Sequence, residues 1–238
     1  MIFYFIRHGD PIYNPDSLTA LGHKQAAALA KRLSLYGLDE IYASSSMRAQ
    51  MTAKPTCELL GKEMEILDWA NESYAWENTA LPLEDGNYTW SFYIPEMVER
   101  YNDSKMLTLG REWYKHPCFA NTKLKGGLQW LDEKIDSLFS SFGYVHNREK
   151  GCYEITQKNE KRIALFAHQG LGLAFMSSLL DIPYPVFCTR FDIGHSGVTV
   201  IQFSNDRNVV YPKILQLSND SHLYKEDILT GYHNIIHI

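Results

Sequence analysis

IFYFIRHGD, residues 2–10 of the chain, joins five apolar or aromatic residues to an arginine, a histidine and a glycine. The run 2–6 is typical of a buried β-strand. Polar groups that directly follow a buried parallel strand lie at the edge of the sheet where ligands bind in open α/β folds. Arg7 offers an anion a planar fork of donors, and His8 can act as a nucleophile or carry a proton near neutral pH. A strand that ends in two solvated polar residues is the alternative interpretation of this stretch alone.

The composition is that of a folded protein with a substantial core. Of the 238 residues, 45% are hydrophobic and 13% are aromatic, which argues against disorder. One domain with an insertion is expected at this length. The net charge of −5 disfavours general binding to nucleic acid, which needs a basic surface.

The cysteines and the apolar segments indicate the compartment. Four scattered cysteines without a CxxC pair predict reduced thiols rather than a zinc or redox site. The N-terminal stretch lacks the features of a signal peptide, and no apolar run is long enough to span a bilayer. We therefore expect a cytoplasmic protein without a membrane partner.

Apolar runs alternate with helical patterns along most of the chain. Strands are expected at 2–6, 38–43, 63–67 and 162–167, with a closing pair at 197–203 and 209–217. Helices are expected at 20–35, from Arg48 to Leu60 after a capping serine, at 127–142 and at 171–180. This alternation predicts an α/β three-layer sandwich around a mostly parallel central sheet. The tail after Ser218 should pack on the surface, with His233 and His237 as structural residues.

Residues 73–125 depart from this alternation. They are rich in tryptophan and tyrosine, contain three prolines and show no regular strand–helix pattern. We interpret them as an inserted cap subdomain within a single domain spanning 1–238, with short helices near 95–101 and 108–115. Because a dense aromatic cluster above a polar site favours a partly apolar ligand, the cap is expected to set substrate choice.

Four predicted strand ends carry groups suited to one chemistry. The first offers Arg7 and His8, the second leads to Arg48, the third to Glu72 and the fourth to His168. These ends should share one edge of the sheet together with two helix N-termini, whose free N–H groups attract anions. Two arginines, two histidines and two helix starts make a phosphate-sized anion site. A nearby carboxylic acid can protonate a leaving oxygen.

This pattern resembles the histidine phosphatase superfamily, also called the phosphoglycerate-mutase-like family. The similarity covers about 1–72 and 160–205. It is carried by four motifs: Arg7-His8-Gly9 with Asn14, Leu18-Thr19-Ala20-Leu21-Gly22 with Gln25-Ala26, Ser44-Ser45-Ser46-Met47-Arg48-Ala49 with Thr52-Ala53, and Phe166-Ala167-His168-Gln169-Gly170. Four ordered motifs at matching strand ends are far more specific than one tripeptide. The resemblance implies the phosphoglycerate-mutase-like fold.

The resemblance also implies a phosphohistidine mechanism. His8 would attack phosphorus, while Arg7, Arg48 and His168 would hold the phosphoryl oxygens with help from Asn14. Neighbouring arginines keep a nucleophilic imidazole neutral and stabilise charge on the phosphoryl oxygens. No metal or other cofactor is expected.

The sequence departs from the family pattern at several points. The loop between Asn14 and Leu18 is short, and the proton-donor motif is poorly matched. Glu72 fits the donor best because it closely follows the third strand, and Glu77 is its main rival. Glu77, Gln169 and His195 are also candidates for substrate binding. Asn14 could instead form only an Asx-turn.

We therefore predict a hydrolase, a metal-independent phosphatase that cleaves small phosphomonoesters through phospho-His8. The cap should favour esters with an apolar or aromatic part. A phosphoglycerate mutase is the enzymatic alternative, disfavoured by the short loop after Asn14, and a non-catalytic module that binds phosphorylated ligands is the other. The expected partner is a small phosphorylated metabolite, and a homodimer is left open.

Overall fold

The structure is a computed structural model, and it describes residues 1–232 and 236–237. At its centre is a six-stranded sheet in the order β13-β11-β1-β10-β4-β5. The strands are β1 Ile2–Arg7, β4 Glu40–Ser44, β5 Glu65–Leu67, β10 Arg162–Ala167, β11 Val198–Gln202 and β13 Lys213–Asn219. Strands β1, β10, β4 and β5 run parallel, whereas β11 and β13 run antiparallel to their neighbours. The expected α/β fold with a mostly parallel sheet is confirmed.

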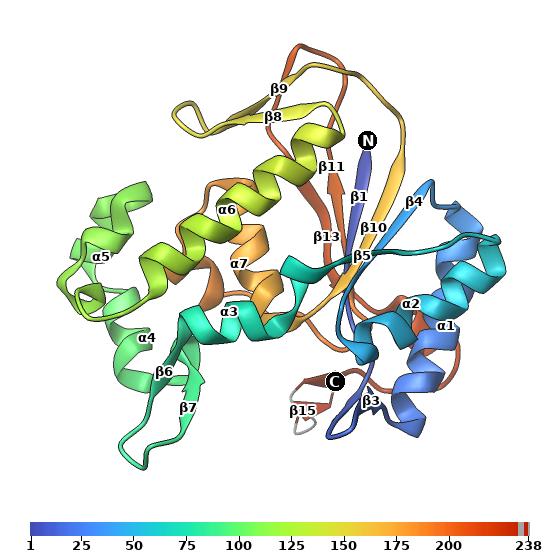
Figure 1. Cartoon of the computed structure of the whole chain (residues 1–238), viewed down its shortest axis with the longest axis horizontal. Coiled ribbons are helices and arrows are strands. Elements are labelled where there is room, and N and C mark those ends of the chain that lie inside the picture. Colours follow the sequence, from blue (N-terminus) through green and yellow to red (C-terminus); the bar gives the residue numbers. More distant parts are fainter. Residues whose placement is uncertain (233–235, 238) are drawn as a thin grey trace.

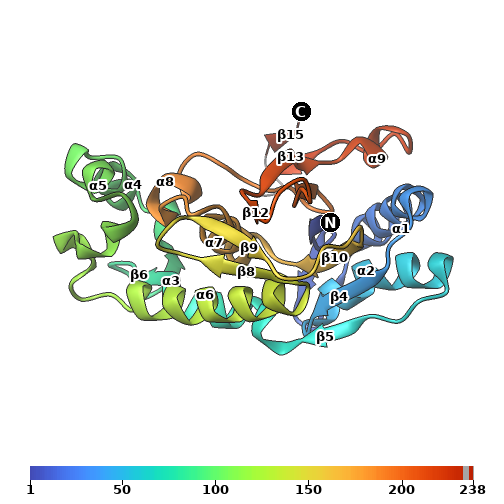
Figure 2. The same ribbon diagram turned by 90° about the horizontal axis from the view of Figure 1, so that it is seen from above.

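Helices cover both faces of this sheet, as Figures 1 and 2 show. Helices α1 (Ala20–Tyr36) and α2 (Met47–Leu60) lie on one face, and α6 (Leu124–Ser141) and α7 (Gln169–Leu180) on the other. Side chains alternate along β1. Tyr4 and Ile6 pack in the core beneath α1 and α2, and Phe3 and Phe5 in the core beneath α6 and α7. Burial on both faces explains why this strand is an unbroken apolar run.

The insertion between the third strand and α6 is built from short elements. They are η1 Asp68–Ala70, α3 Glu72–Thr79, β6 Ala80–Pro82, β7 Tyr88–Trp90, η2 Ser91–Tyr93, α4 Pro95–Tyr101, α5 Ser104–Leu109, η3 Gly110–Lys115 and η4 Pro117–Phe119. The expected helix at 95–101 matches α4, whereas the one at 108–115 is split between α5 and η3. Buried aromatic residues of the insertion belong to the same core cluster as Phe3 and Phe5. Helices α4 and α5 lie to the side of α6 and α7, and α3 with the β6–β7 hairpin lies nearer the carboxyl ends of the strands (Figure 1).

Several small elements were not expected or differ from expectation. The unexpected ones are β2 Pro11–Tyr13, β3 Asp16–Leu18, β8 Tyr144–Asn147, β9 Cys152–Ile155, α8 Tyr184–Cys188, α9 Ser221–Tyr224, β14 Gly231–Tyr232 and β15 Ile236–His237. The prediction of a single strand at 209–217 is wrong. Val209 and Val210 form β12, which pairs with β9, and the partner of β11 begins only at Lys213. His233 lies outside the described residues, and of His237 only the backbone is described. Within the described ranges, no helix combines the length and apolar character needed to cross a membrane.

A buried histidine fixes the far end of α7. His146 of β8 has its Nδ1 2.9 Å from Asp136 Oδ1 of α6, and its Nε2 2.9 Å from Asp181 Oδ2 at the end of α7. Arg148 Nε donates to Asp136 Oδ2 at 2.7 Å. Burial alone lowers the pKa of His146, but the bonds to Asp136 and Asp181 outweigh it and raise that pKa. His146 therefore binds its proton more tightly in the folded chain than in the unfolded chain.

We predict that His146→Gln destabilises the protein more at pH 6 than at pH 9. The pKa of His146 is higher in the folded chain than its ordinary value of 6.5. Its protonation therefore stabilises the fold fully below pH 6.5, and this stabilisation is lost as the pH rises through the folded-state pKa. The loss at pH 6 should be about 1–3 kcal/mol, because two partly buried carboxylates lose their donor. Urea unfolding of both proteins at each pH measures this difference. A loss that is equal at the two pH values would contradict the role of the proton.

Candidate active site

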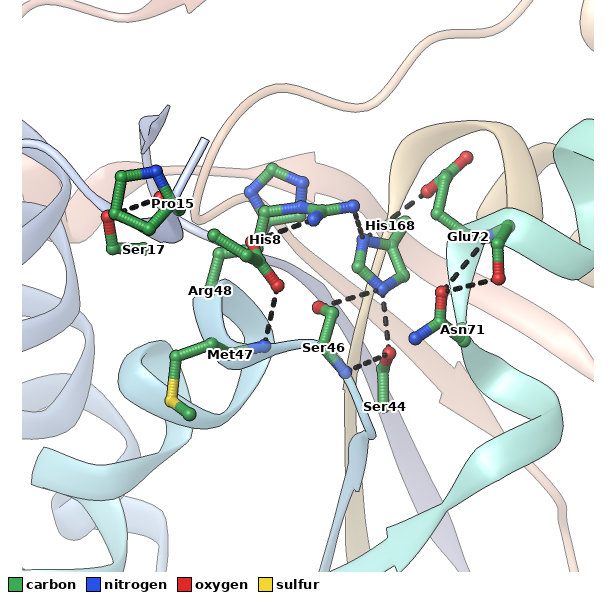
Figure 3. A network of polar contacts seen from close by, with 12 residues as sticks. His8, Pro15, Ser17, Ser44, Ser46, Met47, Arg48, Asn71, Glu72 and His168 are labelled. Carbon is green, nitrogen blue, oxygen red and sulfur yellow. Dashed lines mark hydrogen bonds and ion pairs between the residues drawn. The ribbon is translucent and has the colours of Figure 1, made fainter. Parts of the chain in front are cut away.

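Two histidines meet at the carboxyl ends of β1 and β10. Parallel pairing sets Arg7 opposite Ala167, and the backbone N–H of His8 donates to Ala167 O at 2.9 Å. The residues that follow, His8 and His168, therefore lie side by side, with ring centroids 5.2 Å apart. Figure 3 shows His168 between Arg48 and Glu72, with His8 beside them. The sheet thus brings together the groups predicted at four separate strand ends.

His8 is held with one ring nitrogen available for reaction. Its Nδ1 lies 2.7 Å from Gly9 O, which can only accept, so Nδ1 carries the proton and Nε2 keeps its lone pair. Gly9 is fixed in turn by a bond from its N–H to Thr52 Oγ1 at 2.9 Å. A Cβ at Gly9 would lie 2.8 Å from the carbonyl oxygen of Gly22, so only glycine fits. Burial is the largest cause that lowers the pKa of His8, and the charges of His168, Arg7 and Arg48 lower it further. Together they hold this pKa well below its ordinary value. The imidazole is therefore neutral at pH 7.

His168 is also neutral, with the opposite tautomer. Arg48 Nη2 donates to its Nδ1 at 3.1 Å, so the proton sits on Nε2, which lies 2.8 Å from Ser44 Oγ. Burial is the largest cause that lowers the pKa of His168, and the positive charges of Arg48 and Arg7 lower it further, to well below its ordinary value. Ser44 ends β4, so the strand itself supplies the acceptor that orients this ring.

Arg48 is positioned by a carboxylate from the short β2–β3 hairpin. Its Nη1 donates to Asp16 Oδ1 at 2.8 Å, and Asp16 Oδ2 accepts the first N–H of α2, from Met47, at 2.7 Å. Ser46 occupies the N-cap position as expected but makes no side-chain capping bond, and Asp16 accepts the N–H of Met47 in its place. The Arg48 guanidinium carbon lies 5.3 Å from the centre of the Tyr13 ring. These contacts fix the arginine while its buried Nε has no hydrogen-bond partner among the described residues.

Arg7 is buried behind the histidines. Its Nη1 donates to Ile193 O at 2.6 Å, and its Nη2 donates to His195 Nε2 at 2.8 Å. His195 Nδ1 faces Asp10 Oδ1 at 3.6 Å. Burial lowers the pKa of Arg7, and the nearby Asp192 carboxylate opposes this shift. Its Nε, like that of Arg48, has no partner within the described part of the chain.

Glu72 is the carboxyl group beside the histidine pair. Its Oε2 lies 3.4 Å from His168 Nδ1, and its Oε1 accepts the N–H of Leu171, in the first turn of α7, at 3.3 Å. Asn71 caps α3 through Ser73 N and binds Ser45 Oγ at 3.0 Å, which ties Glu72 to the second strand end. A helix N-terminus stabilises the negative charge that remains after proton donation.

A cavity of about 390 Å³ opens over these groups. Its walls come from β1, the β2–β3 hairpin, α2, α3, β7 and α7: Arg7, His8, Tyr13, Arg48, Asn71, Glu72, Ser73, Trp76, Trp90 and Gln169. Gln169 Nε2 donates to Tyr93 Oη at 3.1 Å, so Tyr93 of the insertion also reaches the site. The cavity therefore combines an anion-binding floor with aromatic walls.

The structure separates the weaker sequence candidates. Glu77 lies on the exposed side of α3 and does not line the cavity, in contrast to Glu72. Asn14 is exposed in the turn of the β2–β3 hairpin, because Tyr13 pairs with Asp16, and it does not line the cavity either. Gln169 lines the cavity. His195 lies behind Arg7 and orients it instead of facing the cavity.

Several groups that position the site had no role assigned from the sequence. Ser44 could have been found, because it is a polar residue at a predicted strand end. Asp16 had no such signal, because it reaches the site from a hairpin whose path the sequence does not reveal. Tyr93 is one of the insertion aromatics that were expected near the substrate, and it contacts Gln169. Among residues 1–232 and 236–237, no cluster of three or more His, Cys, Asp or Glu side chains has the arrangement of a metal site.

A second cavity of about 280 Å³ lies near the other end of α7. Its charged residues include Asp132, Arg148 and Asp181. Arg148 pairs with Asp132, and Asp181 contacts the buried His146. The charged groups of this cavity are therefore already used to hold neighbouring elements together.

Comparison with known proteins places this geometry in a family. The sequence model of the histidine phosphatase superfamily (branch 1) matches residues 3–84, which contain Arg7, His8, Arg48 and Glu72. Phosphoserine phosphatase 1 of Hydrogenobacter thermophilus is 26% identical over 230 residues, which are 92% of each chain. Over residues 3–84 the chain matches the histidine phosphatase superfamily, which is the family that the sequence motifs resemble. The expectation of a phosphoric monoester hydrolase of the histidine phosphatase type is confirmed at this level.

Solved phosphatases share the fold. Phosphoserine phosphatase from Entamoeba histolytica, in complex with 3-phosphoglyceric acid, has a TM-score of 0.58 at 18% identity, covering 93% of this chain and 98% of that one. The mycobacterial glucosyl-3-phosphoglycerate phosphatase in complex with VO3 has a TM-score of 0.57 at 18% identity, covering 91% and 98%. At this identity the likeness shows the architecture alone.

Because Gly170 has no side chain, Trp90 of the insertion and Glu72 can both lie close to its backbone. A Cβ at this position would lie 2.4 Å from two ring carbons of Trp90 and 2.7 Å from Glu72 Oε1. We predict that Gly170→Ala lowers kcat/KM by roughly 10²-fold, because displacing a reacting group by about 1 Å can have that effect. Steady-state kinetics with an alkyl phosphate measure the loss.

Gly126→Ala in α6 is the matched control, since a Cβ there meets no atom within 4 Å. This control should keep wild-type kinetics and gain about 0.5–1 kcal/mol of stability. Wild-type activity in folded Gly170→Ala would show that the close approach of Trp90 and Glu72 to Gly170 does not matter for the reaction.

Proposed function

We propose that this histidine phosphatase hydrolyses small phosphomonoesters through a covalent phosphohistidine at Nε2 of His8. The observation that carries the proposal is the fixed tautomer of His8. Nδ1 is used by Gly9 O at 2.7 Å, so the lone pair of a neutral imidazole is on Nε2. A neutral, oriented imidazole is the form of histidine that can attack phosphorus.

Arg7 and Arg48 supply the positive charge for the phosphoryl group. Each is fixed by protein acceptors, Ile193 O for Arg7 and Asp16 for Arg48. Each also has a buried Nε without a partner among the described residues. Donors that are placed before the reaction stabilise charge on the phosphoryl oxygens in the transition state without reorganisation. His168 Nε2 is occupied by Ser44, so this ring mainly shapes the site and orients Arg48.

The first step forms a bond between His8 Nε2 and phosphorus and breaks the bond between phosphorus and the ester oxygen. Glu72 in its acid form gives its proton to that oxygen, which leaves as an alcohol. In the second step the Glu72 carboxylate takes a proton from water. The resulting hydroxide attacks phosphorus, the bond to Nε2 breaks, and inorganic phosphate leaves a neutral His8.

Water as the acceptor agrees with the shape of the site. The hairpin between Asn14 and Leu18 is short, and Tyr13 and Ser73 on the wall of the cavity are exposed. A mutase must hold its phosphoenzyme away from water until a second alcohol arrives. Hydrolysis is therefore favoured over phosphoryl transfer between two positions of a metabolite.

We predict that His8→Ala abolishes phosphatase activity without loss of the fold. The wild type, mixed with a labelled substrate and denatured at alkaline pH, should retain acid-labile label, and the variant should retain none. Circular dichroism and the thermal midpoint of unfolding serve as the folding control. Turnover by folded His8→Ala would refute the nucleophile, and binding without turnover in the wild type would indicate a phospho-ligand binding module.

Glu72→Gln should slow the hydrolysis of alkyl phosphates by roughly 10²–10⁴-fold, the usual scale of general acid catalysis. Activated aryl phosphates should lose less, because their leaving oxygen needs less protonation. Glu77→Gln is the matched control, since it removes the same charge from the exposed side of α3. The assignment fails if Glu77→Gln shows this dependence on the leaving group and Glu72→Gln does not.

A further inference from the structure

The charges around the cavity restrict the substrate that this proposed phosphatase accepts. Within the described part of the chain, Arg7 and Arg48 are the cations that line the cavity. Both lie at its phosphoryl end, where the two Nη groups of each arginine already donate to the protein. The two arginines match the charge of one phosphate dianion. A second anion on the substrate would find no further cation on the cavity wall.

Carboxylates lie directly beside the two arginines. Asp16 lies 2.8 Å from Arg48. Glu72, which faces the cavity beside His168, supplies no positive charge in the acid form that begins the reaction. Asp192 accepts from Gln169 Nε2 at 2.5 Å and acts electrostatically on Arg7. The low pKa values of His8 and His168 keep both rings neutral, so neither offsets these carboxylates. A carboxylate on the leaving group would therefore be repelled where it must bind.

The wall near the acid is aromatic. Trp76 and Trp90 meet edge to face, with ring centroids 4.9 Å apart at 88°. Phe92 stacks behind Trp90 at 5.7 Å and 11°, and the absence of a side chain at Gly170 lets the Trp90 ring approach Glu72. The leaving oxygen takes its proton from Glu72, so the rest of the alcohol lies against these two indoles. This wall is fixed by packing, which favours flat apolar groups.

We propose that the site selects phosphomonoesters of uncharged aromatic or apolar alcohols and discriminates against esters that carry a carboxylate near the phosphate. The inference rests on the proposed phosphatase reaction at His8. The insertion supplies the apolar selection through Trp76 and Trp90. The carboxylates around Arg7 and Arg48 supply the discrimination against a second negative charge.

The test compares substrates whose leaving alkoxides are alike. 3-Phosphoglycerate and its methyl ester differ by one negative charge, and benzyl phosphate adds an aromatic ring without activating the leaving group. The methyl ester should have a kcat/KM at least about tenfold above that of the free acid, and benzyl phosphate should exceed both. A preference for 3-phosphoglycerate or O-phosphoserine would overturn the proposal. Preference for phosphocholine over benzyl phosphate would overturn it in favour of a cationic leaving group.

A new cation on the wall tests the electrostatic cause. Ser73 is exposed and lines the cavity in the first turn of α3. Ser73→Lys should raise the ratio of kcat/KM for 3-phosphoglycerate to that for its methyl ester, and Ser73→Gln, the matched neutral variant, should not. An unchanged ratio in Ser73→Lys would contradict the electrostatic cause.

The same panel of esters separates an error in the substrate class from an error in the proposed reaction. His8→Ala should be inactive on every ester in the panel. If it is inactive while the wild type prefers the carboxylate substrates, the reaction stands and the substrate class is wrong. If His8→Ala hydrolyses any of the esters, the reaction itself is wrong.

Discussion

The parallel pairing of β1 with β10 is the contact on which the site depends. Arg7 lies opposite Ala167, and His8 N–H donates to Ala167 O, so the next residue of each strand contributes one histidine. A shift of one residue in this register would turn the side chains of one strand to the other face. That shift is opposed by the burial of Phe3 and Phe5 in one core and of Tyr4 and Ile6 in the other. Packing of the two cores thus fixes the distance between His8 and His168.

Charge at the site is balanced so that the arginines stay available. Arg48 is paired with Asp16, and Arg7 donates to a backbone carbonyl and to Nε2 of His195. A buried cation without any partner would be costly, whereas a fully paired cation would not bind phosphate. Partial pairing meets both demands. The same cations, together with burial, keep His8 and His168 neutral, which is the state the proposed nucleophile needs.

The sequence predicted the parts of this arrangement that follow from strand ends. Arg7, His8, Arg48 and His168 each directly follow or closely succeed an apolar run, and parallel strands bring such positions together. Glu72 was separable from Glu77 only by its nearness to the third strand. Helix periodicity located α1, α6 and α7 to within three residues. These successes depend on local patterns that repeat every two or 3.6 residues.

What the sequence could not predict depends on contacts distant in the chain. Asp16 reaches Arg48 across 32 positions, and Tyr93 reaches Gln169 across 76. The β8–β9 hairpin carries the buried His146 network, yet its short strands gave no clear alternation. Asn14 was assigned to the phosphate site only because it belongs to a family motif. The tight hairpin holds it on the surface, away from the cavity.

The central claim is that Nε2 of His8 forms the bond to phosphorus. Phosphorus-31 NMR of the trapped, alkali-denatured phosphoenzyme distinguishes phosphate on Nε2 from phosphate on Nδ1, and peptide mapping identifies the residue. The account predicts a single Nε2-phosphohistidine at His8, because Nδ1 is bound to Gly9 O. Phosphate on Nδ1, or on any residue other than His8, would contradict it.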